Sequence, residues 1–169
     1  ISSWKNYKSI NKYSIGIEIS NPGHEYSYKK FSKEQVKSII KLSTYLIKKY
    51  NIKPNFILGH SDIAPDRKKD PGEKFPWKYL SKNKIGHWHN LNEKELFKKR
   101  NLTEGKNEKI KFIKNLYEIG YPKNILINKY KYSKLLTTAF QRRFRQELVN
   151  GIIDQECLVI SNNLAKNLK

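Results

Sequence analysis

Hydrophobic and polar residues alternate strictly in one short stretch near the start of the chain. Residues 13–19, YSIGIEI, place isoleucine at every second position, with Ser14, Gly16 and Glu18 on the opposite face. A period of two residues is typical of a β-strand with one buried face. The pattern therefore predicts a strand over 13–19. Its far face would carry Glu18 beside a glycine that leaves room for close approach to the backbone, the alternative being an ordinary exposed carboxylate.

The following stretch changes to the period of a helix. Apolar residues recur at three- and four-residue spacing across 32–50, and lysines populate the opposite face. Ser32 with Gln35 three positions later is the pattern of a capping box. The short apolar run that ends at Leu58, behind Pro54, predicts a second strand over 56–60. Strand, helix and strand form a βαβ-like unit, whose crossover would bring the ends of both strands to one edge of a sheet.

Three further amphipathic helices are predicted in the second half of the chain. They cover residues 106–119, 133–148 and 154–168. Gly120 is a C-terminal stop signal for the first, and Asp154 is an N-cap candidate for the last. The single Cys157 lies in the apolar pattern of the last helix, which favours a role in core packing.

These patterns predict an α/β protein in two parts. Residues 1–90 would form a mixed β-sheet flanked by helices. Residues 91–105, rich in Asn, Glu and Lys, are typical of a linker with a short helix. Residues 106–169 would form a separate small three-helix bundle.

The composition narrows the classes of partner. Lys and Arg number 35 against 15 Asp and Glu, a net charge of +20. Such a balance suits nucleic acid, but the lysines are spread along the chain among many Asn, Ile and Tyr, so we predict no nucleic-acid partner. A polyanionic cell-wall partner suits the charge equally well. No apolar run is long enough to span a membrane.

The loop 59–77, GHSDIAPDRKKDPGEKFPW, is the strongest candidate for chemistry. Its three prolines exclude helix and fix its shape, so it can hold His60 and Asp70 in one geometry. Imidazole nitrogen and carboxylate oxygen are ligands of zinc in hydrolytic sites. The predicted topology also brings Glu18 and Lys68 to this edge. The alternative is an ordinary solvated loop. A second histidine segment, GHWH at 86–89, we interpret as a structural tryptophan between two exposed histidines.

The loop closely resembles the zinc-binding segment of the type 2 N-acetylmuramoyl-L-alanine amidases, a family related to the peptidoglycan recognition proteins. It matches the pattern H-x-D-[IL]-x-P-x-R-K-x-D-P-G-x-x-F-P-W throughout, and GIEISNP at 16–22 resembles a second family element. The resemblance implies that His60 and Asp70 are zinc ligands, that Lys68 stabilises the oxyanion and that Glu18 is the general base.

Beside these, Arg67 is a candidate for binding a peptide carboxylate, the alternative being a surface arginine. In the family, a third zinc ligand, a histidine, precedes the strand with the general base. We expect it upstream of Ile1, because the chain lacks Met and begins abruptly. A separate N-terminal piece of the same protein would then supply it; two ligands alone would bind zinc weakly.

The function that the resemblance implies is zinc-dependent hydrolysis of the amide between N-acetylmuramic acid, or its anhydro form, and L-alanine. The alternative is a module that binds peptidoglycan or muropeptides without cleaving them. Residues 137–154, TTAFQRRFRQELVNGIID, resemble the peptidoglycan-binding-domain-1 family, which implies affinity for the cell wall. The expected location is the bacterial envelope or periplasm, with the cytoplasm as the alternative.

Overall fold

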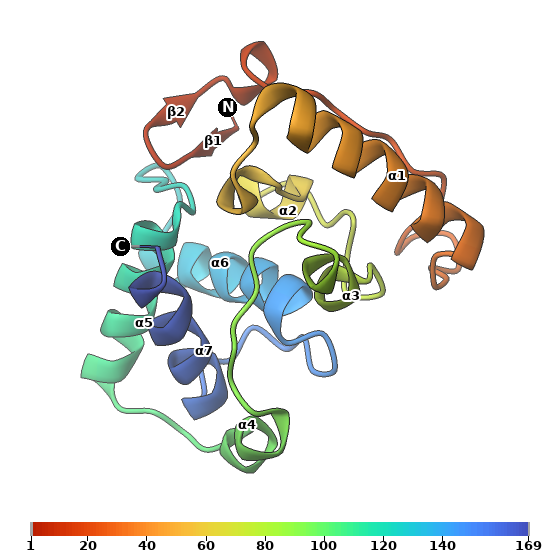
Figure 1. The fold of residues 1–169 in the computed structure, drawn as a ribbon. Helices are drawn as coiled ribbons and strands as arrows, with labels where there is room; N and C mark the ends of the chain where they lie inside the picture. The colour runs from red at the N-terminus through yellow and green to blue at the C-terminus, as the bar shows by residue number, and fades with distance from the viewer. Residues whose placement is uncertain (1, 169) are drawn as a thin grey trace.

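A computed structural model describes residues 2–168 of the protein. Among them the fold is mixed α/β, with a two-stranded sheet and seven α-helices (Figure 1). The elements are β1 (Ser3–Trp4), β2 (Tyr7–Lys8), α1 (Lys33–Tyr50), α2 (His60–Ile63), α3 (Trp77–Lys82), α4 (Glu93–Lys99), α5 (Lys106–Ile119), α6 (Lys129–Phe144) and α7 (Gln155–Lys166). Short 3-10 turns cover Ile10–Lys12 and Pro54–Phe56. None of the described helices has the length and apolar character needed to cross a membrane.

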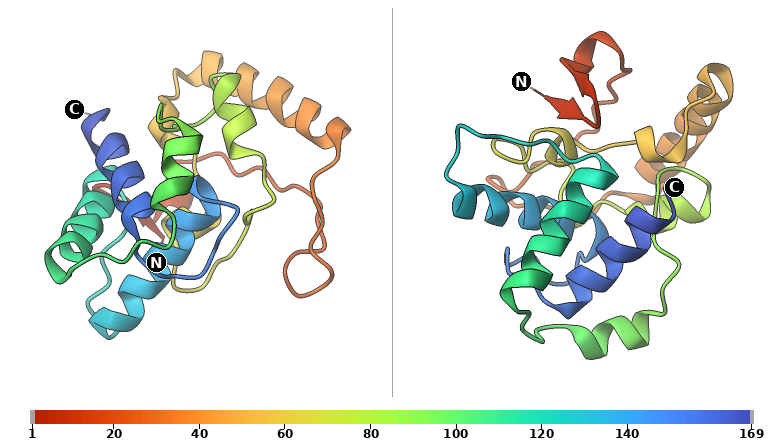
Figure 2. Two further views of the ribbon diagram at one scale, coloured as in Figure 1. Left: turned by 90° about the horizontal axis from the view of Figure 1, so that it is seen from below. Right: turned by 90° about the vertical axis from the view of Figure 1, so that its left-hand side faces the viewer.

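The two strands form a small hairpin at the edge of the molecule (Figure 2). Trp4 packs the hairpin against the rest of the protein. Its indole is buried and donates a hydrogen bond of 3.0 Å to the Asn55 carbonyl. The indole also contacts the edge of the Tyr121 ring in a T-shaped arrangement. Gly120, at φ +136°, ends α5 directly against this indole, where a Cβ atom would lie 2.6 Å from the ring. Only glycine fits there, so the predicted stop signal at Gly120 is confirmed, with close packing as a second reason.

The two predicted strands of the βαβ-like unit are wrong. Residues 14–23 carry neither helix nor strand, and the stretch 56–60 is divided between the last residue of a 3-10 turn, three positions outside helix and strand, and the first residue of α2. A strand is stabilised by hydrogen bonds to a neighbouring strand, and neither segment pairs with another among residues 2–168. Of the isoleucines expected on one buried face, Ile19 packs against the core, whereas Ile15 and Ile17 are exposed.

The helix predicted over 32–50 is confirmed, including its capping box. The Ser32 hydroxyl accepts a hydrogen bond from the Gln35 amide at 3.1 Å, and the Gln35 side chain accepts one from the Ser32 amide at 2.9 Å. Ile39 is the helix's buried apolar contact and packs with α3 and the residues around it. The apolar face of α1 thus covers the end of the proline-containing loop rather than a sheet.

We expect Ser32→Ala to lower the free energy of unfolding by about 1 kcal/mol, because the mutation leaves the Gln35 amide without its acceptor at the helix N-terminus. Ser38→Ala is the matched control, since Ser38 is exposed within the same helix and alanine favours helix. Urea unfolding measures both. Equal destabilisation by the two mutations would contradict the capping role.

Of the three C-terminal helices, α5 packs against both α7 and α6, and α6 in turn contacts α2 and α3 (Figure 1). Fully or almost fully buried side chains fill this region: Phe112, Leu116, Leu136, Phe140, Cys157, Ile160 and Leu164. Burial raises the pKa of the Cys157 thiol to about 12, which keeps it neutral and confirms its predicted place in the core. The predicted N-cap Asp154 is also confirmed, accepting from the Cys157 amide at 3.0 Å.

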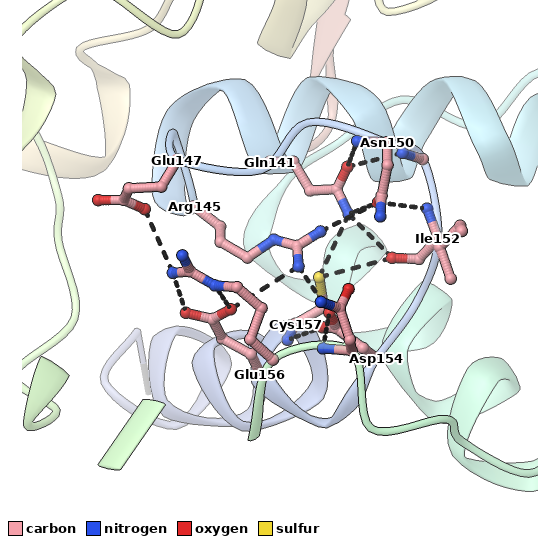
Figure 3. A network of polar contacts seen from close by, with 11 residues as sticks. Gln141, Arg145, Glu147, Asn150, Ile152, Asp154, Glu156 and Cys157 are labelled. Atoms are coloured by element: carbon pink, nitrogen blue, oxygen red, sulfur yellow. Dashed lines mark hydrogen bonds and ion pairs between the residues drawn. The ribbon is translucent and has the colours of Figure 1, made fainter. Parts of the chain in front are cut away.

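The middle helix, α6, is shifted relative to its prediction. It begins at Lys129, where the Asn128 side chain caps it, and ends at Phe144 rather than Leu148. The chain leaves the helix at Arg145, whose buried guanidinium donates to Asp154 at 2.5 Å (Figure 3). Helical periodicity does not reveal this ion pair, which holds the residue at which the chain leaves the helix.

One apolar core contains residues from both sides of the predicted linker. Trp4, Ile63 and Ala64, from the first half of the chain, are buried together with Leu116 and Phe140 from the second. The division into units at 1–90 and 106–169 stays a prediction. Within 91–105, the expected short helix is present as α4.

Candidate active site

The residues expected to bind metal lie on a single helical turn and on the loop that follows it. His60 is the first residue of α2, and Asp70 lies ten positions later. Nδ1 of His60 is 2.6 Å from Oδ2 of Asp70, a hydrogen-bond distance. Both side chains are open to solvent, with exposed fractions of 49% and 57%. The structure therefore brings the two predicted ligands together at the surface.

Backbone hydrogen bonds fix the path between these two residues. The Ser61 amide donates to the Asp70 carbonyl at 2.9 Å, which ties the start of α2 to the end of the loop. The amides of Arg67 and Lys68 both donate to the Ala64 carbonyl, at 3.2 and 3.0 Å. The loop is thus ordered by its own hydrogen bonds as well as by its prolines.

The remaining predicted site residues are placed less closely. Arg67 is exposed and Lys68 is half-buried on the loop, and Glu18 is exposed in the irregular segment 14–23. Within the described part of the chain, no hydrogen bond or ion pair joins the side chain of Glu18, Lys68 or Arg67 to His60 or Asp70. Their roles stay predictions.

A buried polar network directly beneath His60 escaped the sequence analysis. The Asp62 carboxylate, 1% exposed, accepts from the Gly59 amide at 2.9 Å, from the Tyr121 hydroxyl at 2.8 Å and from Nη1 of Arg143 at 2.5 Å. Burial, with the charge of Asp62, raises the pKa of Tyr121 well above 10, so the phenol remains a donor. The only sequence signal was an aspartate two residues after a histidine.

A second cluster lies beside the far end of the loop. His24 Nε2 is 2.9 Å from Glu73 Oε2, and Nε of Arg142 is 3.9 Å from the same oxygen. Burial acts to raise the pKa of Glu73, but the hydrogen bond from His24, a backbone hydrogen bond and the charges of His24 and Arg142 together outweigh it, and the pKa is lowered. His24, Glu73, Arg142 and Gln146 are among the residues lining a cavity of about 390 Å³. The loop and α6 therefore both contribute residues to the lining of this cavity.

The structure of the segment GHWH, residues 86–89, agrees only in part with the interpretation drawn from the sequence. Trp88 packs against both apolar cores, as expected, but the two histidines are not exposed: His89 is buried and His87 half-buried. Burial lowers the pKa of His89 to about 4. The pKa of His87 is lowered by burial and by the charge of Arg143. Both imidazoles are thus neutral at pH 7 and act as packing groups, because the segment passes between the two cores.

His89 should make the protein less stable in mild acid. Its folded pKa of about 4 lies below the ordinary 6.5, so the unfolded chain binds a proton that the folded protein does not. The contribution is fully present above about pH 6.5 and is lost as the pH falls towards 4. Urea unfolding across this window should show a smaller fall in stability for His89→Gln than for the wild type. Identical pH dependence would contradict the assignment.

The donor set fits two positions of a zinc site. Imidazole and carboxylate are both zinc ligands, and here they already converge on each other. Residues 2–168 contain no cluster of three His, Cys, Asp or Glu side chains that could hold a metal ion. A complete site therefore needs at least one ligand in addition to this pair.

Known proteins resemble the chain over different lengths. Residues 2–73 match the family described as N-acetylmuramoyl-L-alanine amidase. The amidase AmiD of Escherichia coli is 31% identical over 97% of this chain and 61% of AmiD. The 1,6-anhydro-N-acetylmuramyl-L-alanine amidase AmpD of Haemophilus influenzae is 35% identical over 48% of this chain and 43% of AmpD. The chain thus spans less than two thirds of these relatives.

Solved structures resemble almost the whole chain. E. coli AmiD, in complex with anhydro-N-acetylmuramic acid-L-Ala-D-gamma-Glu-L-Lys, superposes with a TM-score of 0.87 over 99% of this chain and 66% of AmiD, at 31% identity. AmpDH3 of Pseudomonas aeruginosa, with an anhydromuramic pentapeptide, gives 0.83 over 99% of this chain and 68% of that protein, at 28% identity. The resemblance inferred from the loop is confirmed: the chain is similar to the N-acetylmuramoyl-L-alanine amidases, and its residues 2–73 match that family.

Proposed function

We propose that the protein of which this chain is part hydrolyses the amide between N-acetylmuramic acid, or its anhydro form, and L-alanine, with zinc as cofactor. One observation carries the proposal: His60 and Asp70, which the resemblance implies are zinc ligands, meet at 2.6 Å on the surface. The named relatives are amidases of this class, and two solved neighbours hold muropeptides, which supports a peptidoglycan-derived substrate.

The roles of the chain's own residues follow from their chemistry. A bound zinc ion would lower the pKa of a water molecule and polarise the amide carbonyl. His60 and Asp70 would hold the ion together with at least one further ligand. Glu18 would take a proton and return it to the leaving amine. Lys68 would offset negative charge on the oxyanion, and Arg67 would bind a carboxylate of the peptide.

The C-terminal helices suit a wall-binding role. Their resemblance to a peptidoglycan-binding family and the net charge of +20 both support contact with cell-wall polymers. We place the protein in the bacterial envelope or periplasm on the same grounds. A recognition module without catalysis is the alternative, and the carboxylate at Glu18 and the ammonium at Lys68, which binding alone does not need, argue against it.

Asp70→Ala tests the metal site. The intact protein should contain zinc by elemental analysis and release L-alanyl peptide from a soluble anhydromuropeptide. Asp70→Ala should lose both properties, since it removes one of the two protein ligands in the loop. Asp66→Ala is the matched control, because Asp66 is an exposed aspartate of the same loop outside the ligand positions. If wild type and Asp70→Ala held equal zinc, the assignment would be wrong.

A further inference from the structure

The single turn α2 needs support from outside itself. It contains four residues, His60–Ile63, and a helix this short is not stable on its own. The histidine at its start is exposed, whereas Ser61, Asp62 and Ile63 are buried. The position of His60 is therefore set by what lies beneath α2.

That support comes largely from one residue of α6. Arg143, 3% exposed, donates from Nη1 to Asp62 and from Nη2 to the Ile57 carbonyl at 2.9 Å. Its guanidinium also lies over the Trp77 ring, 4.2 Å from the centroid. The two hydrogen bonds grip the chain on both sides of His60, three residues before it and two after it.

A further hydrogen bond connects α2 to Asp70, the second proposed zinc ligand. Ser61 lies between His60 and Asp62, and its amide holds the Asp70 carbonyl. A shift of α2 would therefore move both members of the His60–Asp70 pair. Hydrogen-bonded groups behind metal ligands commonly set ligand orientation and metal affinity.

We propose that Arg143 is a positioning residue: acting through Asp62 and the Ile57 carbonyl, it holds α2 in the orientation that lets His60 and Asp70 bind zinc together. The C-terminal helices would then have a part in catalysis in addition to any contact with the cell wall. For its kinetic readout, this inference rests on the proposed function.

Arg145 provides a matched control for the experiment. It lies two residues away, is equally buried and is also paired with a buried aspartate, Asp154 (Figure 3). Among residues 2–168, none of its side-chain hydrogen bonds or ion pairs reaches α2. Lysine at either position keeps the positive charge but lacks the planar guanidinium group, which can donate hydrogen bonds to two acceptors at once. The pair Arg143→Lys and Arg145→Lys thus separates positioning from general stability.

In the intact protein, Arg143→Lys should weaken zinc affinity by ~10–100-fold and lower kcat with little change in KM. Arg145→Lys should leave both unchanged while the protein remains folded. Hydrogen exchange at the Gly59 and Ser61 amides, without metal, should speed up only in the Arg143 variant. Guanidinium ion should restore zinc affinity to Arg143→Ala and leave the zinc affinity of Arg145→Ala unchanged.

Equal effects of the two lysine variants on zinc affinity and amide exchange would overturn the inference and leave Arg143 a structural residue. A wild type that binds zinc but cleaves no muropeptide would refute the proposed amidase function, while zinc affinity and exchange would still decide the role of Arg143. The two proposals therefore fail separately.

Discussion

Replacing Glu18 by alanine should reduce turnover of an anhydromuropeptide by ~10²–10⁴-fold and leave zinc content unchanged. The reason is chemical. A general base and acid contributes only to the proton transfers, whereas metal retention depends on His60, Asp70 and the further ligand. Glu18 is exposed and has no hydrogen-bond or ion-pair partner among residues 2–168, so its loss should cost little stability.

Glu25→Ala is the matched control, because Glu25 is an exposed carboxylate seven residues away. Glu18→Gln should be nearly as inactive as Glu18→Ala, since an amide keeps the shape but cannot accept the proton. Activity and zinc content are measured on the same preparations. Turnover by Glu18→Ala near the wild-type rate would remove the general-base role from this residue.

Replacing Arg145 by methionine should lower the free energy of unfolding by ~3–5 kcal/mol. Asp154 is 2% exposed and accepts from Arg145, from the Asn101 amide at 3.1 Å and from the Cys157 amide at 3.0 Å (Figure 3). Methionine fills a similar volume but leaves the buried carboxylate without its cation. Because Asp154 caps α7 and anchors the segment before α5, the loss should spread through all three C-terminal helices.

Lys131→Met is the control for this prediction, because Lys131 is an exposed cation on α6, the helix that precedes Arg145. Its effect should stay within about 0.5 kcal/mol. Urea or thermal unfolding measures both variants. A loss below about 1 kcal/mol for Arg145→Met would mean that water or a rearranged side chain satisfies Asp154 without the guanidinium.

The sequence correctly predicted those structural features that depend on residues close together in the chain. The capping box at Ser32, the stop at Gly120 and the N-cap at Asp154 were all readable from the sequence, because each depends on residues within about one helical turn. The loop motif was readable for a similar reason: its prolines and short-range hydrogen bonds hold His60 and Asp70 together within eleven residues.

Predictions were wrong, or could not be made, where the outcome depends on residues that are far apart in the sequence. Alternating isoleucines predicted a strand over 13–19, but a strand needs a neighbour, and residues 2–168 supply none to this segment. The histidines of GHWH looked polar and exposed, yet His89 is buried because two apolar cores meet around Trp88. Nothing near these residues in the sequence encodes either outcome.

The sequence by itself determined the amphipathic helices, their caps and the ligand-type pair of the loop, because side-chain periodicity and short-range hydrogen bonds act between near neighbours. Only the tertiary structure decided that Arg143, 81 positions after Asp62, pairs with it, and that Arg145, where the chain leaves α6, pairs with Asp154. A buried carboxylate must find a cation wherever the fold brings one, and sequence separation carries no information about which cation that will be.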